Sequence, residues 1–350
     1  METLSSIWNT VWPILIAIVA FGLLITIHEF GHFIVAKKCG IKVNKFAVGF
    51  GPAIWKKQKG ETEYSVRIFP LGGFCAMEGE DESSDDERAF GNKPVWKRIL
   101  VVLAGSFNNL LLGLILFIII TAMEPTHATT TIAEFTENSM SHSTGLEVGD
   151  TITSINGSRV FVSSDIVYEL LRDHDGVFEM IVKRNGETVE LPNVTFELEE
   201  HKDYDQKIFK QDFYVSSEKT TFITGITHGT KTAISYGRIV YKSLFDLLRG
   251  RFKVSDMSGP VGVVQAIGDA TSEGFDDLLF LIAFISINLG LFNLIPFPGL
   301  DGGRFWFLAA EGITRKKIPT KYEAYINLAG LALLVLLSLV ITYSDITKIF

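Results

Sequence analysis

The stretch His28-Glu29-Phe-Gly-His32 interrupts an apolar run, residues 14–36, that is long enough to cross a lipid bilayer as a helix. Residues four apart share one face of a helix, so the imidazoles of His28 and His32 can reach a single metal ion. Glu29 lies a step round the helix, where its carboxylate can hold a water at that metal and take its proton. Each charged group at the centre of a spanning helix costs roughly 2.5–3.5 kcal/mol. The three ionisable groups therefore predict a metal site with partners or a water-filled cavity around it.

The composition of the chain also indicates a membrane protein. Of its 350 residues 47% are apolar, and the mean hydropathy is +0.28, which is high for a soluble protein. The net charge of -8 disfavours a nucleic-acid partner, although the charges are segregated between loops. Cys39 and Cys75 fall in one loop, so no disulfide framework is expected. No Lys or Arg precedes the first apolar run, which is untypical of a cleavable signal peptide, and we expect this run to be a retained helix.

Four apolar runs have the length and composition of membrane-spanning helices. They are residues 14–36, 99–123, 278–294 and 324–343. The predicted fold class is a polytopic α-helical membrane protein with about four transmembrane helices, a membrane-associated β element in the first loop, and an extracytoplasmic α+β domain.

Lysine and arginine orient the loops, because cytoplasmic loops retain these residues near the ends of spanning helices. Loops 37–98 and 298–323 are rich in both, whereas the first dozen residues carry neither. We therefore expect both loops in the cytoplasm, and both termini and the segment 124–276 outside it. The histidines lie in the later half of an inward-running helix, so the metal site is expected toward the cytoplasmic side.

The first cytoplasmic loop contains two β-type segments, residues 43–50 and 64–69, with turns that are marked by glycine and proline. Irregular backbone at membrane depth is tolerated only inside protein or beside water. Residues 43–74 are therefore predicted to form a membrane-entering β element that dips toward the histidines. The acidic stretch that follows, residues 78–87, is expected to be solvated and mobile.

Residues 124–196 have the pattern of a small mixed domain. Strands are expected at residues 151–155, 177–184 and 187–191, with an Asn-Gly hairpin turn after the first and between the last two. An amphipathic helix over residues 163–172 completes a set of elements that resembles, in this order, a PDZ domain.

The predicted domain organisation has four parts. They are residues 1–123 with the first two transmembrane helices, the histidine motif and the β element; residues 124–196 as a PDZ domain; residues 197–276 as a connector with an amphipathic helix from Tyr236; and residues 277–350 with the last two transmembrane helices.

A catalytic zinc site usually has three protein ligands and an open position for water, so the two histidines need a third ligand. In the soluble metzincin pattern a third histidine follows at fixed spacing, but Val35 and Lys38 occupy those positions. Near the other predicted spans the candidates are Glu124, at the outer end of the second, and Asp301, at the inner end of the third. The depth of the histidines in their helix favours Asp301.

Three motifs resemble those of the site-2 protease family. Residues 293–302, Asn-Leu-Ile-Pro-Phe-Pro-Gly-Leu-Asp-Gly, resemble its N-x-x-P-x-P-x-L-D-G signature, and residues 105–109, Gly-Ser-Phe-Asn-Asn, resemble its G-x-x-x-N motif. Residues 258–262, Ser-Gly-Pro-Val-Gly, are similar to a segment of the RseP-type branch. The motifs of all three core helices occur in the family's order, with the PDZ-like segment between the second and third. The chain differs from well-known members in having one recognisable PDZ domain rather than two.

The resemblance implies a role for each matched residue. His28, His32 and Asp301 would bind Zn2+, and Glu29 would be the general base. The other matched residues would contact the substrate backbone or line its path, and they are Gly105, Asn109, Asn293, Pro296 and Pro298. The β element would hold the substrate in an extended conformation.

The function implied by the resemblance is that of an intramembrane zinc metalloprotease, a metalloendopeptidase, in a bacterial plasma membrane. Its substrates would be single-span membrane proteins, such as anti-sigma factors, or remnant signal peptides, cleaved within the lipid bilayer in regulated intramembrane proteolysis. The chain is expected to be a monomer. The PDZ domain is expected to act as a gate that excludes bulky ectodomains, since domains of this kind use an exposed sheet edge to add a strand. Capture of a substrate carboxylate is the alternative, but a conventional peptide-binding loop is not obvious upstream of Gly145.

Two other functions are compatible with parts of the pattern. A membrane-tethered zincin would cut juxtamembrane loops, and it would carry its histidine motif beyond the end of a spanning helix rather than inside one. A PDZ-bearing membrane scaffold or metal carrier would be non-catalytic, although the intact Glu29 argues against it. Asn109 also has a purely structural interpretation, because an interhelical hydrogen bond contributes about 0.6 kcal/mol on average in membranes.

Overall fold

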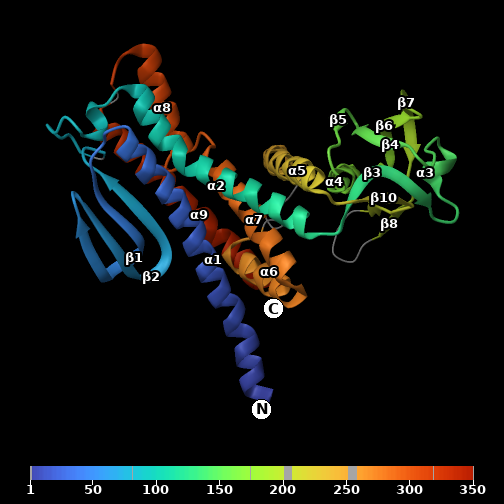
Figure 1. Cartoon of the computed structure of the whole chain (residues 1–350), viewed down its shortest axis with the longest axis horizontal. Coiled ribbons are helices and arrows are strands. Elements are labelled where there is room, and N and C mark those ends of the chain that lie inside the picture. The colour runs from blue at the N-terminus through green and yellow to red at the C-terminus, as the bar shows by residue number, and fades with distance from the viewer. Residues whose placement is uncertain are drawn as a thin grey trace. The chain divides into compact units, whose positions relative to one another are not determined.

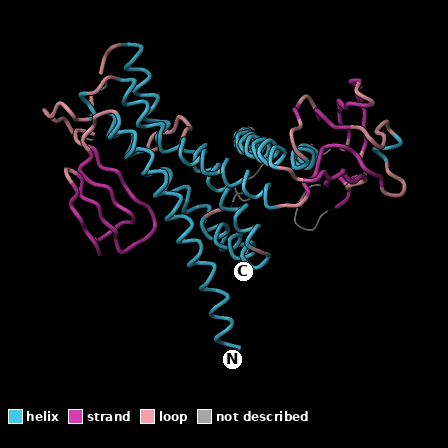
Figure 2. Tube along the Cα trace, viewed as in Figure 1, coloured by secondary structure: helices cyan, strands magenta, loops and turns pink. Residues whose placement is uncertain are grey.

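The computed structural model describes residues 2–80, 82–173, 175–200, 207–250, 258–317 and 319–349. The chain divides into two compact units. Residues Met1–Leu116 and Ser243–Phe350 form the helical unit, and residues Phe117–Lys242 form the β unit. Figure 2 shows the strands in two groups, one beside the first helix and the other in the β unit.

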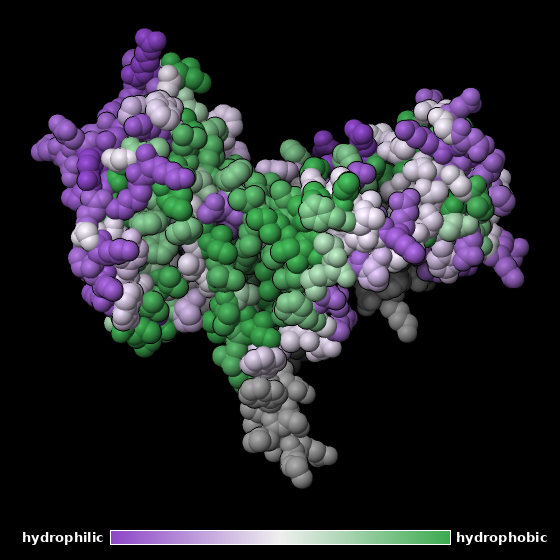
Figure 3. Space-filling model, in the orientation of Figure 1, coloured by the Kyte–Doolittle hydropathy of each residue, from purple (hydrophilic) through white to green (hydrophobic). Residues whose placement is uncertain are grey.

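In the part of the chain that the structure describes, four helices contain segments that are long and apolar enough to cross a membrane, in agreement with the predicted number. They are α1 (Glu2–Lys38), α2 (Val95–Met123), α7 (Phe275–Asn293) and α9 (Thr320–Ile349). Large apolar side chains remain exposed along their outer faces, and Figure 3 shows the resulting apolar surface over the helices. Such a surface is typical of a helix bundle that packs against lipid rather than water.

Small residues bring the backbones of these helices close together. A Cβ atom on Gly31 of α1 would lie 2.3 Å from the carbonyl oxygen of Ala104 on α2. A Cβ atom on Gly290 of α7 would lie 2.9 Å from the carbonyl oxygen of Ser106, also on α2. Helices in membranes associate through this kind of close packing, because lipid gives no hydrophobic drive toward association. Helix α2 is therefore fixed against both α1 and α7.

Strands β1 (Val43–Lys59) and β2 (Thr62–Met77) form a sheet beside α1 (Figure 1). Residues 45–48 of β1 pair with residues 63–66 of β2 and also with residues 73–76. The last part of β2, residues 73–77, is therefore an edge of the sheet among the described strands. The two β-type segments expected from the sequence lie within these longer strands.

Shorter helices complete the helical unit. They are η1 (Phe90–Asn92), α6 (Pro260–Glu273) and α8 (Asp301–Thr314). Helix α6 begins directly after Gly259 in the Ser-Gly-Pro-Val-Gly motif, and the backbone N–H groups of Gly259 and Gly262 each donate to the Asp345 carboxylate at 2.9 Å. A carboxylate at a helix N-terminus satisfies otherwise unpaired N–H groups. The motif thus joins α6 to the end of α9.

The β unit is built on a sheet with strand order β10-β3-β4-β6-β7, and β5 pairs with β4. Its elements are β3 (Thr126–Phe135), α3 (Met140–Ser143), β4 (Thr151–Ile155), β5 (Ser158–Arg159), α4 (Ser163–Arg172), β6 (Val177–Arg184), β7 (Glu187–Thr195), β8 (Leu198–Glu200), β9 (Lys207–Phe209) and β10 (Phe213–Lys219). Ile152, Phe178 and Met180 are fully buried at its centre. The apolar core lies between the sheet and α4.

Local sequence signals match several of these elements. Strand β4, helix α4 and strand β6 have the bounds that the sequence predicts, and β7 continues to Thr195. Asn156 and Asn185 have φ values of 46° and 53°, and a glycine with positive φ follows each of them. This backbone conformation is the one that the Asn-Gly pair favours in two-residue hairpin turns.

Helix α5 (Phe222–Leu248) begins at Phe222, earlier than the amphipathic helix expected from Tyr236. It is joined to α4 by an ion pair between Lys242 and Glu169 and by a hydrogen bond between Ser235 and Asp165. The same helix stacks the ring of Tyr236 on Phe117 at the end of α2, with 5.4 Å between ring centroids. Helix α5 therefore connects α4 firmly to the end of α2.

Candidate metal centre

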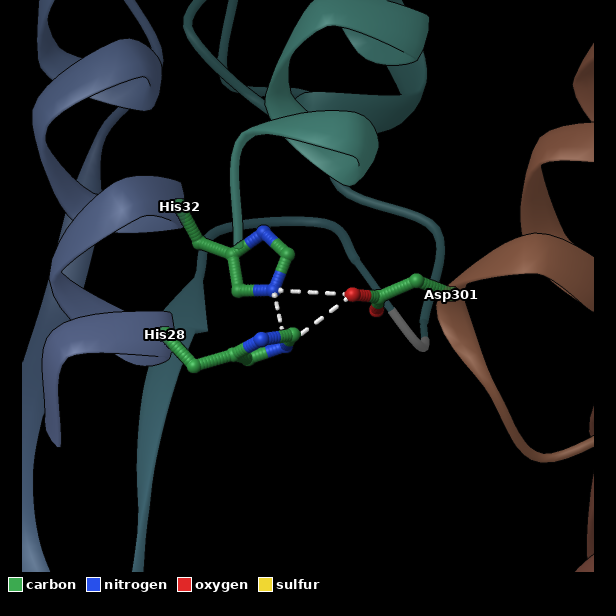
Figure 4. Close-up of side chains that lie close together, drawn as sticks. All are labelled: His28, His32 and Asp301. Atoms are coloured by element: carbon green, nitrogen blue, oxygen red, sulfur yellow. Dashed lines mark hydrogen bonds and ion pairs between the residues drawn. The ribbon is translucent and has the colours of Figure 1, made fainter. Parts of the chain in front are cut away.

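His28 and His32 of α1 meet Asp301, the first residue of α8, inside the helical unit (Figure 4). Asp301 Oδ2 lies 3.0 Å from His28 Nε2 and 3.3 Å from His32 Nε2, and the two Nε2 atoms are 3.2 Å apart. Among the described residues these three form the one group of His, Cys, Asp or Glu side chains that could hold a metal ion. The structure thus brings together the two histidines and the carboxylate that the sequence favoured as third ligand.

Helix α2 supplies a partner for the second nitrogen of His32. His32 Nδ1 donates to the backbone carbonyl of Val101 at 2.8 Å. A neutral imidazole with its proton on Nδ1 presents a lone pair at Nε2. His32 Nε2 and the Asp301 carboxylate therefore face each other as two electron-pair donors, an arrangement that a bound cation stabilises.

Gly105 of α2 leaves the space in which the ligand atoms converge. A Cβ atom there would lie 2.4 Å from His32 Nε2 and 2.6 Å from His28 Nε2. Asp301 Oδ2 is buried and has no hydrogen-bond donor of its own among the described residues. Two imidazoles and one carboxylate are a donor set of catalytic zinc sites, in which a fourth position stays open. The residues present therefore fit a zinc ion.

The turn before α8 aims Asp301 at the histidines. Helix α7 ends at Asn293, and the chain turns through Pro298 and Gly299, which has a φ of +93°. The backbone N–H of Gly299 donates to Asn327 Oδ1 of α9 at 3.2 Å. A Cβ atom on Gly330 of α9 would lie 2.1 Å from the carbonyl oxygen of Pro298, so α9 touches the turn directly.

Asn327 and Gly330 were missed in the sequence. Both are polar or small residues within the apolar run of the last spanning helix, and such exceptions indicate a contact between helices. They position the ligand loop and do not touch the metal-binding atoms.

A cavity of about 350 Å³ adjoins the three ligands. Its lining residues are His28, Glu29, His32, Phe74, Cys75, Ala76, Met77, Glu80, Val101, Val102, Asp301 and Arg304. Residues 74–77 belong to the edge part of β2, so an exposed strand edge runs along the cavity. Glu29 lines the cavity and lies against this edge, because a Cβ atom on Gly73 would lie 3.5 Å from Glu29 Cγ.

Glu80 and Arg304 close one side of this cavity. Arg304 Nη1 donates to Glu80 Oε1 at 2.5 Å, and Nη2 donates to the carbonyl oxygen of Glu80 at 2.9 Å. Arg304 lies on α8, three residues after the ligand Asp301. Glu80 belongs to the acidic stretch that was expected to be solvated and mobile, and the structure instead holds it by this paired contact.

The remaining predicted site residues lie at different distances from the cluster. Asn109 is completely buried on α2, and its amide nitrogen lies 3.3 Å from His28 Nδ1. Asn293, Pro296 and Pro298 lie at or after the end of α7, and none of them lines the cavity in the described part of the chain. Glu124, the other candidate ligand, follows the end of α2 and is not part of the group.

Two histidines within a helix that can span a membrane, a carboxylate from a second helix and an acidic residue beside them define a membrane metallopeptidase type of site. The sequence profile described as peptidase family M50 matches residues 16–337. The chain therefore belongs to this family, the site-2 proteases, and the match confirms the prediction of a metalloendopeptidase.

Individual relatives agree with the family. The chain is 39% identical over 337 residues to a protein of Clostridium perfringens, covering 95% of this chain and 98% of that relative. It is 30% identical over 432 residues to zinc metalloprotease RasP of Geobacillus kaustophilus, with both chains covered completely. It is 29% identical over 416 residues to the regulator of sigma-W protease RasP of Bacillus subtilis, covering 95% and 98% of the two chains.

Proposed function

We propose that this chain is a zinc-dependent protease of a bacterial plasma membrane that cleaves single-span membrane proteins within their transmembrane segments. The observation that carries the proposal is that Asp301 converges with His28 and His32 beside Glu29, where the two histidines and Glu29 lie within a helix that can span a membrane. A relative that matches this chain over its full length is named a zinc metalloprotease. Helix α1 is apolar on both sides of the motif, which favours cleavage inside the bilayer over cleavage of a juxtamembrane loop.

In this proposal the two histidines and Asp301 hold the zinc ion, and Glu29 is the general base. Zinc supplies Lewis-acid chemistry, which polarises the scissile carbonyl and lowers the pKa of water. Glu29 accepts the proton of the attacking water and later gives a proton to the leaving amine. Its place beside the cavity, outside the group of ligands, fits this role.

The edge of β2 is the proposed place for the substrate backbone. A peptide bond in a helix is shielded by its own hydrogen bonds, so the substrate has to become extended before it is cut. Residues 73–76 pair with β1 on one side and form an edge among the described strands, and an extended peptide can add to such an edge as a further strand. Asn293, Pro296 and Pro298 lie next in sequence to the ligand Asp301, and we assign them to the path of the substrate or to the shape of the ligand loop.

The substrate class follows from the likeness to characterised relatives. One relative is named a regulator of sigma-W protease. We infer that this chain cuts a membrane-bound anti-sigma factor or remnant signal peptides, both of which are single apolar segments that match the cavity and the strand edge. The chain would act as a monomer, because the ligands and the base come from one copy.

The orientation proposed from the charged loops puts both termini and the β unit outside the cytoplasm. The β unit would then contain the PDZ domain that acts as a gate for substrates. Its six-stranded sheet, with helix α4 beside the edge strand β10, supports this proposal. Within the β unit, helix α5 is joined to α4 and stacks on the last part of α2, and we assign this assembly to a gate against bulky ectodomains.

The test is a comparison of Glu29→Gln with Glu124→Gln in purified detergent-solubilised protein. Glu29→Gln should keep zinc and lose cleavage of single-span peptides by about 10²- to 10⁴-fold, because a general base of this kind contributes that much. Glu124→Gln changes an exposed carboxylate, the other candidate for the third ligand. It should leave both zinc content and cleavage unchanged.

Mass spectrometry of the products then locates the cut. Cleavage within the apolar segment supports the proposal, whereas cuts confined to the flanking loops would make the chain a juxtamembrane zincin. A Glu29→Gln protein that still cuts at the normal rate would remove the proposed base. Zinc binding by the unmodified protein without turnover of any peptide would favour the non-catalytic scaffold.

A further inference from the structure

Three residues of α2 at a spacing of four, Val101, Gly105 and Asn109, form one stripe against the ligand helix α1. The carbonyl of Val101 accepts from His32 Nδ1, and Gly105 lies beside both Nε2 atoms. Asn109 occupies the equivalent place beside His28, with its amide 3.3 Å from Nδ1. Val101 and Asn109 thus each lie at the Nδ1 atom of one histidine, whereas both Nε2 atoms face Asp301.

The direction of the Asn109 amide decides which nitrogen of His28 can bind metal. If the amide nitrogen faces the ring, His28 Nδ1 must accept, and the neutral ring carries its proton on Nε2, where the metal should be. That orientation also leaves Asn109 Oδ1 buried without a hydrogen-bond partner among the described groups. The two ends of an amide have nearly the same shape, so their assignment rests on the hydrogen bonds that each orientation allows.

The opposite orientation satisfies both groups. Asn109 Oδ1 then accepts the proton of His28 Nδ1, and the lone pair of His28 Nε2 points toward Asp301. His28 and His32 come to have the same arrangement, with Nδ1–H bonded to an oxygen of α2 and Nε2 directed at the metal. The freed amide nitrogen lies one helical turn from Ser106, whose buried hydroxyl has no other partner among the described residues.

We propose that Asn109 is a positioning residue that holds His28 as a metal ligand through an Nδ1–H to Oδ1 hydrogen bond. The proposal rests on the zinc site described above and assigns Asn109 to a ligand rather than to the substrate. Its side chain is completely buried and does not line the cavity, which leaves it no surface for a peptide. Ser286 Oγ of α7 donates to the carbonyl of Asn109 at 2.8 Å, so α7 also holds the backbone of this residue.

The expected effect is on zinc affinity. Loss of an outer partner of a metal-bound histidine typically lowers metal affinity by about 10- to 100-fold. A purely structural interhelical hydrogen bond would instead lower stability and leave the bound metal unchanged.

The neighbouring residue provides a matched control. Asn108 Nδ2 donates to the carbonyl of Ile27 on α1 at 3.1 Å, so it joins the same two helices without touching a ligand. Zinc dissociation constants of Asn109→Leu and Asn108→Leu are measured by competition with a chelator in the full-length protein. Asn109→Leu should bind zinc about 10- to 100-fold more weakly than the unmodified protein. Asn108→Leu should bind zinc with unchanged affinity.

Asn109→Asp separates the two amide orientations. A carboxylate can only accept a hydrogen bond, so it can replace Oδ1 but cannot replace a donating amide nitrogen. This variant should keep zinc affinity at or above that of the unmodified protein, and it decides the question even if Asn109→Leu does not fold. In the cobalt-substituted proteins the visible ligand-field bands should be unchanged in Asn108→Leu and altered in Asn109→Leu.

Two results would overturn the proposal. One is an Asn109→Leu protein that binds zinc as tightly as Asn108→Leu, and the other is an Asn109→Asp protein that has lost as much affinity as Asn109→Leu should lose. Absence of zinc binding by the unmodified protein would instead overturn the metal site itself. The failure of the underlying function and the failure of the role of Asn109 are therefore distinguishable.

Discussion

The helical unit and the β unit place polar and apolar groups in opposite ways. In the β unit Ile152, Phe178 and Met180 are fully buried, and an apolar core lies beneath a more polar surface. In the helical unit His28 and Asn109 are buried, whereas large apolar side chains cover the outer faces of the helices. Burial of apolar surface away from water drives the folding of the first arrangement. Close packing and satisfied polar groups hold the second.

This difference indicates which residues of the chain serve function. A polar residue on the surface of the β unit is ordinary, because it faces water. A polar residue inside a membrane-spanning helix is costly and therefore needs a physical reason, and here the reason is the metal site. Substitutions at the centre of the helical unit should therefore change chemistry with little loss of fold, and substitutions in the core of the β unit should do the reverse.

The largest effect is expected from Gly105→Ala. The added methyl group would lie 2.4 Å from His32 Nε2 and 2.6 Å from His28 Nε2, where the metal-binding atoms converge. Zinc content should fall to background and cleavage should be lost, whereas unfolding of the β unit should be unchanged. Metal analysis and a peptide cleavage assay on the same preparation measure both consequences.

Gly113→Ala is the control for this substitution. Gly113 lies on the same helix, and its added methyl group would meet the Ile287 side chain of α7 at 2.6 Å. This variant should lose stability by overpacking, about 1–3 kcal/mol, and keep zinc. Equal zinc loss in both variants would show that the metal site depends on helix packing in general and would remove the contrast between chemistry and fold.

The next effect is expected from Phe178→Ala in the β unit. This ring is fully buried and stacks edge to face on Phe196, with 5.5 Å between ring centroids. Removal of a buried phenylalanine side chain costs about 3–5 kcal/mol. Hydrogen exchange should therefore rise throughout the sheet of the β unit, and zinc content should stay at the level of the unmodified protein.

A surface substitution on the same strand provides the reference. Glu179 adjoins Phe178, and its side chain points to the opposite face of the sheet. Glu179→Ala should therefore change the free energy of unfolding, as measured by hydrogen exchange, by no more than about 0.5 kcal/mol. Zinc loss in Phe178→Ala would contradict the separation of the two units, because it would mean that the ligands depend on the β core.

Much of the architecture could be predicted because its signals are local. Asn156-Gly and Asn185-Gly fix hairpin turns through their positive φ values, and the apolar runs of the spanning helices are visible without any tertiary information. The spacing of His28 and His32 predicts a shared ligand face, and the choice of Asp301 followed from depth and from the resemblance to a known motif. These inferences use only the period of a helix and the thickness of a bilayer.

What could not be predicted depends on contacts between distant segments. The double pairing of β1 with two parts of β2 has no local signal, and neither has the contact of Arg304 with Glu80 across the cavity. Helix α8 begins at Asp301, within residues 298–323, for which the sequence analysis predicted a loop. Asn109 was predicted from its motif as a substrate contact, whereas its contact with His28 depends on how α2 packs against α1.

The smallest effect concerns His228 at the start of α5, where the β unit should respond to acid. Burial, with His127 and Lys231 nearby, lowers the pKa of His228 to about 4, and its ring lies 4.4 Å from that of His127. The unfolded chain binds a proton near pH 6.5 and the folded chain does not, so stability is full above pH 6.5 and falls as pH drops toward 4. Because the ring is partly exposed, we expect the free energy of unfolding to fall by only about 1–2 kcal/mol. The measurement is hydrogen exchange in α5, which should be faster at pH 5 than at pH 7 after correction for intrinsic rates. His228→Gln should remove this difference, and a variant that keeps the full pH dependence would assign the acid sensitivity to another group.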